Sequence, residues 1–118
     1  MTRIRFTAAA AAAVLALVLA GPASAATKLV ATVGPGFTIS LTKGGKKVTK
    51  VAPGAYRITV RDRSGAHNFL LRGPGGLTRN SGVAFVGTRT WNVTLRRGKA
   101  TFVCTPHASM MKGSFTVG

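Results

Sequence analysis

The chain has 118 residues, of which 17 are lysine or arginine and one is acidic, so its formal net charge at pH 7 is +16. The single acidic residue, Asp62, excludes catalysis by a pair of carboxylates, and the single cysteine, Cys104, excludes an internal disulfide. This length is enough for one small domain.

The N-terminal segment has the pattern of a secretory signal peptide. Arg3 and Arg5 precede an apolar run at residues 6–20, a Gly-Pro pair follows, and small residues lead up to Ala25. The apolar run is shorter than the roughly 20 residues that a membrane-spanning helix needs. We therefore expect residues 1–25 to be removed after Ala25 and residues 26–118 to be exported as one domain, to the periplasm, the cell surface or the medium.

After this segment the sequence predicts an all-β domain. Runs of β-branched and aromatic residues alternate with polar residues and are separated by Gly and Pro turns. Residues 73–82 are rich in glycine and are predicted to be a loop. Seven or eight short strands at this spacing are typical of an antiparallel sandwich or barrel. The predicted strands are residues 28–33, 37–42, 47–51, 55–61, 67–72, 88–95, 99–104 and 113–117.

The predicted mature domain is strongly basic. Without Arg3 and Arg5 it keeps 15 basic residues against Asp62, a net charge of +14. Such a charge attracts acidic partner proteins and anionic cell surfaces, although a solvated basic surface without a partner is an equally good interpretation. Phosphate contacts would also permit nonspecific binding of nucleic acid, but export makes a specific nucleic-acid partner a poor expectation.

The residues with metal-binding chemistry gather near the C-terminal end. Cys104 ends a predicted strand, His107 follows three residues later, and Met110 and Met111 come before the last strand. The other histidine, His67, lies 37 residues before Cys104. One cysteine, two histidines and a weakly bound methionine form the ligand set of an electron-transfer copper site.

Other uses of Cys104 explain less of this pattern. A catalytic cysteine needs a histidine base and a third group that orients it, and Asp62 is the only acidic candidate. A zinc site made of Cys104, His67 and His107 would leave the methionines without a role. A buried cysteine with no function would make the nearby histidine and methionines a coincidence.

The chain resembles the cupredoxins, the small blue copper proteins of the plastocyanin and azurin type. The resemblance lies in the pair His67-Asn68 and in CTPHASMMKG, residues 104–113, and it extends over nearly all of the predicted domain. It implies a Greek-key β-sandwich with one copper ion near one end, held in a plane by His67, Cys104 and His107.

The resemblance also implies roles for neighbouring residues. Asn68 would tie its strand to the cysteine loop, and Pro106 would limit backbone hydrogen bonds to the thiolate. His107 would bring an edge to the surface and pass the electron. Family loops exist with either methionine spacing, but the M-x-G step before the last strand favours Met111 as the axial ligand, with Met110 as the alternative.

We therefore predict a monomeric, exported type 1 copper protein that carries single electrons between redox partner proteins, some of them acidic. It would not be an enzyme. The alternative function is an extracytoplasmic copper carrier or storage protein with the same site. A third interpretation is a basic module that binds anionic polymers at the cell surface.

Overall fold

The computed structural model describes residues 25–118. The predicted signal peptide lies outside the described residues except for Ala25. In the described part, no helix has the length and apolar character that crossing a membrane requires. The elements are β1 (Thr27–Val33), β2 (Ile39–Lys43), β3 (Lys46–Lys47), β4 (Lys50–Val51), β5 (Gly54–Asp62), β6 (Leu70–Gly73), β7 (Leu77–Asn80), β8 (Gly87–Leu95), β9 (Gly98–Val103), the 3₁₀ helix η1 (Thr105–His107) and β10 (Lys112–Val117).

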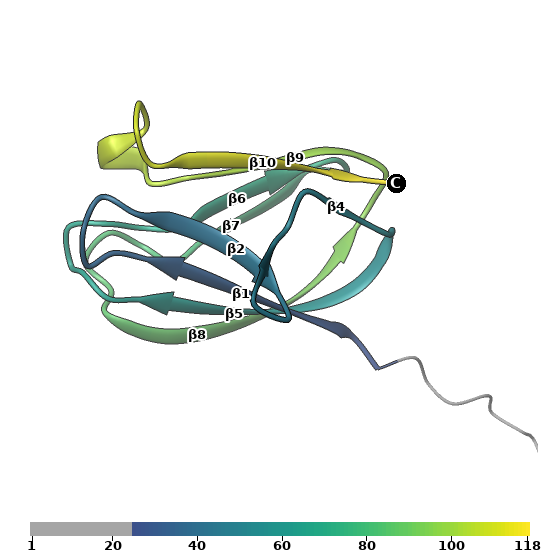
Figure 1. The fold of residues 1–118 in the computed structure, drawn as a ribbon, viewed down its shortest axis with the longest axis horizontal. Helices are drawn as coiled ribbons and strands as arrows, with labels where there is room; N and C mark the ends of the chain where they lie inside the picture. Colours follow the sequence, from purple (N-terminus) through teal and green to yellow (C-terminus); the bar gives the residue numbers. More distant parts are fainter. Residues whose placement is uncertain (1–24) are drawn as a thin grey trace, which may run out of the picture.

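The strands form two five-stranded sheets that pack face to face (Figure 1). One sheet has the order β3-β2-β1-β5-β8 and the other β4-β10-β9-β6-β7. Most neighbours are antiparallel, but β1 pairs with β5 and β4 pairs with β10 in parallel. The chain crosses between the sheets after β3, β4, β5, β7 and β8, a connectivity of the Greek-key kind. The prediction of an all-β sandwich is confirmed.

Details of the predicted strands differ from the structure. Residues 77–80, predicted to lie in a loop, form the edge strand β7, whose side chains are mostly exposed and polar. The predicted strand at residues 67–72 begins only at Leu70, so His67 lies in the preceding loop. The predicted strand at residues 47–51 is divided between β3 and β4, which bring the total to ten.

Alternation along the strands decides which side chains face the core. In β5 the inward side chains are Tyr56, Ile58 and Val60, and the same two-residue period also places Asp62 inside. In β9 the inward positions lead from Ala100 and Phe102 to the next residue of that face, the buried Cys104.

The candidate metal ligands lie at one of the two ends of the sandwich. The loops at residues 34–38, 63–69, 81–86 and 104–111 meet at one end, where η1 is drawn in Figure 1. The β2–β3 and β8–β9 turns, the start of β1 and the end of β10 lie at the other end. All candidate metal ligands belong to the first end, which we call the metal end.

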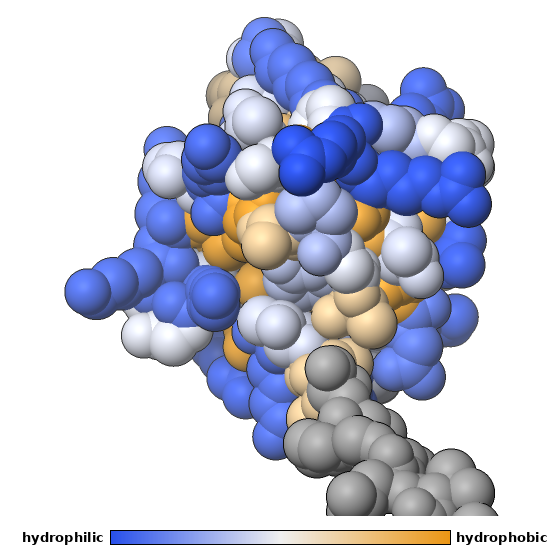
Figure 2. Space-filling model, turned by 90° about the vertical axis from the view of Figure 1, so that its right-hand side faces the viewer, coloured by the Kyte–Doolittle hydropathy of each residue, from blue (hydrophilic) through white to orange (hydrophobic). Residues whose placement is uncertain are grey.

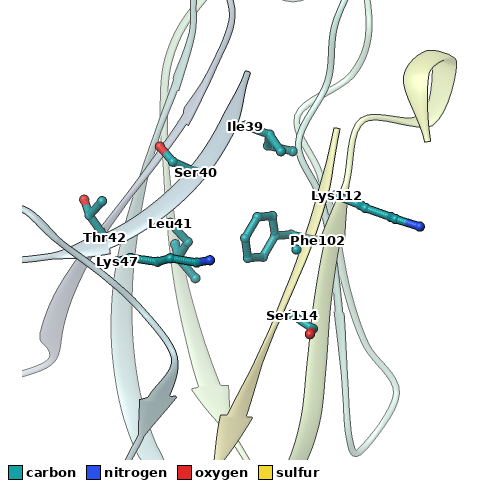
Figure 3. A pocket seen from close by; sticks show the side chains of 9 residues that line it. Ile39, Ser40, Leu41, Thr42, Lys47, Phe102, Lys112 and Ser114 are labelled. Atoms are coloured by element: carbon teal, nitrogen blue, oxygen red, sulfur yellow. The ribbon is translucent and has the colours of Figure 1, made fainter. Parts of the chain in front are cut away.

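A close contact between β9 and β10 explains Gly113. This glycine is paired with Phe102 in the sheet, and a Cβ atom added to Gly113 would collide with the Phe102 ring. The ring stacks on Phe69 at 5.2 Å and faces the groove between β2 and β10 (Figure 3). Because Phe102 is held by its neighbours, only glycine fits at residue 113.

We expect Gly113→Ala to destabilise the protein by about 1–3 kcal/mol, since the added methyl group overpacks the core. Urea unfolding of the metal-free protein measures this change. Gly36→Ala is the control, because its Cβ would meet no atom within 4 Å. A Gly113→Ala protein as stable as the control would show that Phe102 moves aside at no cost.

Candidate metal centre

The loop between β9 and β10 closes on itself through backbone hydrogen bonds. The Cys104 amide donates to the Met111 carbonyl at 2.9 Å, and the His107 amide donates to the Cys104 carbonyl at 3.1 Å. The His107 carbonyl in turn accepts from the amides of Met110 and Met111. These bonds fix the backbone on both sides of the cysteine and turn the His107 ring back toward the thiol.

The second histidine arrives from the loop between β5 and β6. The His67 amide donates to the Ser64 carbonyl at 3.2 Å, which forms a tight turn before the ring. His67 is 3% exposed and is followed by the fully buried Asn68 and Phe69. The burial of these neighbours holds His67 at the metal end next to Cys104.

Three donor atoms from these loops form a compact triangle. The Nδ1 atoms of His67 and His107 lie 3.1 Å apart, and Cys104 Sγ lies 3.7 Å from the first and 3.6 Å from the second. A point within this triangle is about 2.0 Å from all three atoms, close to the lengths of metal–nitrogen and metal–sulfur bonds. The triangle fits a metal ion, and its thiolate and imidazoles suit copper in both oxidation states.

The two adjacent methionines have opposite environments. Met111 is fully buried, whereas Met110 is 61% exposed. Met111 shares the inward face of β10 with Gly113, Phe115 and Val117 by the two-residue period of the strand, and Met110 points the other way. Met111 thus accompanies His67, Cys104 and His107 in the interior, in a cluster that fits one copper ion.

Asn68 connects the two loops that carry the ligands. Its Oδ1 accepts from the Thr105 amide at 2.7 Å and from the Thr105 hydroxyl at 3.2 Å, and its Nδ2 donates to Asn80. Thr105 follows Cys104 directly, so this bond places the cysteine relative to His67. Pro106 lies in η1, is exposed, and has no N–H to donate toward the thiolate.

One residue of the site has no signal in the ligand motifs. Phe37, 62% exposed, places its ring edge-on to both histidines, with centroid distances of 5.8 Å to His67 and 4.9 Å to His107. Gly34 lets the loop that carries Phe37 lie close to His67, because a Cβ atom at residue 34 would lie only 3.1 Å from the His67 ring. An aromatic residue in the glycine-proline turn GPGF was the only hint in the sequence.

Asp62, the last residue of β5, is buried at the metal end, and only one of its two carboxylate oxygens accepts a hydrogen bond. Its Oδ1 accepts from the Ser64 amide at 3.0 Å, while Oδ2 is buried without a hydrogen-bond partner. Burial raises the pKa of the Asp62 carboxyl, and the Ser64 amide and the charge of His67 offset part of that rise. Asp62 therefore costs folding energy when it is ionised.

Comparison with known proteins agrees with this architecture. No protein-family model matches the sequence, and no curated protein matches it. Reduced rusticyanin superposes with a TM-score of 0.59 at 19% identity, over 77% of this chain and 78% of that one. Rusticyanin from Thiobacillus ferrooxidans gives 0.54 at 23% identity, over 77% and 76%. The chain has the cupredoxin fold.

The likeness is not confined to rusticyanin. A methionine-to-glutamine variant of amicyanin in its Cu(I) state aligns with the cupredoxin-fold domain over 78% of this chain and 83% of that one, with a TM-score of 0.53 at 16% identity. Identities this low establish the shared fold alone. In this chain, the feature that fits copper is the donor triangle of His67, Cys104 and His107.

We expect Asp62→Asn to stabilise the metal-free protein more at pH 7 than at pH 3. The raised pKa means that the folded state binds the proton more tightly, so stability is lost as pH rises through the folded-state pKa. The asparagine keeps an acceptor for the Ser64 amide and carries no charge. The melting temperatures of the wild-type and Asp62→Asn proteins are measured across this pH range. An advantage of the variant that shrank with rising pH would contradict the expectation.

Proposed function

We propose that this chain is an exported blue copper protein that carries single electrons between redox partner proteins. The observation that carries the proposal is the triangle of Cys104 Sγ and the two histidine Nδ1 atoms, with Met111 buried beside it. Export is supported by the signal-peptide pattern of residues 1–25. The protein would transform no substrate itself.

The arrangement of these ligands suits electron transfer. A bound copper ion supplies the one-electron couple. Cys104 and His67 are held inside the sandwich, and the loop of Cys104 is closed by backbone hydrogen bonds and by Asn68. A ligand set held this firmly changes little between the two oxidation states, which favours fast exchange of an electron.

The metal end offers a surface for a transient partner. His107 is partly exposed, so its ring connects the buried site with solvent. Among the described residues, every exposed large hydrophobic side chain belongs to this end: Phe37, Val83, Val86 and Met110. Exposed apolar patches of this kind mark protein contact sites. We infer that redox partners dock here, around His107.

We assign the axial position to Met111. Its side chain is buried on the face of β10 that points into the sandwich, whereas Met110 lies on the surface. Met110 then belongs to the apolar docking surface. A flexible thioether is well suited to such a surface because it adapts to partners of different shape.

The same burial argues against the alternative of copper delivery. A carrier hands over its ion by exchanging ligands one at a time with an acceptor, so its ligands must be reachable. Here Cys104 is fully buried and His67 is 3% exposed. We therefore favour electron transfer over copper handover. We also propose that the protein acts as a monomer.

Addition of Cu(II) to the metal-free protein should give an intense blue colour at one ion per chain, as expected for a thiolate–copper site. Cys104→Ser should abolish the colour, and the control Ser109→Ala, an exposed change in the same loop, should keep it. Visible absorption during the titration measures both. A colourless wild-type product, or a blue Cys104→Ser protein, would refute the proposed function.

Met111→Leu should raise the reduction potential, because a thioether near the metal stabilises Cu(II) and leucine offers no donor. Met110→Leu should leave the potential nearly unchanged. Voltammetry of both copper-loaded variants compares them directly. The opposite pattern would move the axial assignment to Met110.

A further inference from the structure

Basic side chains are distributed unevenly along the sandwich. All 15 lysines and arginines among the described residues are exposed. Five lie in the half near the metal end, namely Arg61, Arg63, Arg79, Arg89 and Lys112, and Arg72 lies near the middle of its sheet. Nine lie in the opposite half, which we call the cationic end: Lys28, Lys43, Lys46, Lys47, Lys50, Arg57, Arg96, Arg97 and Lys99.

The strand registers establish this grouping. The tip of the β2–β3 hairpin pairs Lys43 with Lys46, and the β8–β9 turn carries Arg96 and Arg97. Lys50 of β4 and Lys99 of β9 both pair with Thr116, near the end of β10. Figure 2 views the molecule from this side, and hydrophilic side chains surround a few apolar ones there. The cationic charges therefore come from several separate turns.

No acidic side chain neutralises the cationic end. The only acidic residue of the sequence is Asp62, which is 2% exposed and lies at the metal end. The lysines and arginines at the other end therefore have no carboxylate side chain to pair with. Such a surface attracts an anionic partner strongly.

A redox partner docked at the metal end does not account for these charges. The nine residues of β5 span about 30 Å from one end of the sandwich to the other. At physiological ionic strength, interactions between exposed charges are screened over about 8–10 Å. A partner around His107 would feel the cationic end only weakly, so docking at the metal end gives those charges no role.

We propose that the cationic end binds the anionic headgroups of a membrane surface and points the metal end toward the aqueous phase. The proposal rests on the proposed export of the chain. The charges of the cationic end are spread over a broad area and converge on no buried pocket. This distribution suits a plane of many phosphates better than a single ligand. Each basic residue near an anionic bilayer adds to the attraction.

Binding of the isolated protein to lipid vesicles tests this assignment. The protein should sediment with vesicles of phosphatidylcholine and phosphatidylglycerol in about 0.1 M salt, and not with pure phosphatidylcholine. Removing Lys43, Lys46 and Lys50 together by substitution with glutamine should weaken binding by about five-fold per lysine, on the order of 100-fold in all.

A triple variant of equal net charge is the matched control. Arg61→Gln, Arg63→Gln and Lys112→Gln remove three charges from the metal half and should weaken binding less than about five-fold. Equal losses in the two variants would show that net charge alone drives binding and would overturn the assignment. So would stronger binding to soluble polyglutamate than to the vesicles at equal charge concentration.

The orientation of the bound protein on the vesicle is tested by the rate at which its copper is reduced. Reduction of the copper-loaded protein by a neutral hydroquinone should proceed at the same rate with and without vesicles, because the metal end faces water. Strong slowing on vesicles would overturn the orientation. The copper spectrum is recorded separately from vesicle binding. A blue protein that fails to bind vesicles would refute the membrane proposal and leave the proposed copper function intact. A colourless protein that binds vesicles would refute the copper function and leave the membrane proposal intact.

Discussion

The hydrogen bond from the Cys104 amide to the Met111 carbonyl closes the loop on which the metal centre depends. It extends the β9–β10 pairing by one step beyond Val103, the last residue of β9, and Lys112, the first residue of β10. Because that pairing continues, the two-residue period continues as well, and the cysteine sulfur and the Met111 side chain both turn inward. The residues between them have only a short path, which brings His107 back over the thiol.

Local pattern in the sequence was enough for the fold class and for the ligand types. Alternation predicted most strands, and the C-x-x-H loop with its methionines pointed to copper. The strand at residues 77–80 was missed because an exposed, polar edge strand has no apolar alternation. The parallel pairing of β1 with β5 was not predictable, since it joins segments that are far apart in the sequence. Phe37 was missed because its contact with the histidines arises only from the fold.

The separation of apolar and cationic ends affects the site as well as the surface. Like charges crowded around the metal end would repel a cationic metal site and couple its potential to salt. Because most of the cations lie in the opposite half of the sandwich, screening weakens their effect on the metal site, and we expect the residues around the ligands to dominate. We expect Asn68, Pro106 and Phe37 to act on the centre through contact with its ligands or their loop.

The burial of Asp62 leaves the molecular surface without any carboxylate side chain. Hard cations such as Ca²⁺, Mg²⁺ and Mn²⁺ take carboxylate oxygens as their main protein ligands. The surface therefore offers them almost nothing to bind. Among the described residues, the one cluster of histidine, cysteine or acidic side chains able to hold an ion is the soft triangle of His67, Cys104 and His107. The absence of carboxylates from the surface therefore disfavours hard cations, and this adds to the preference of the buried triangle for a soft metal.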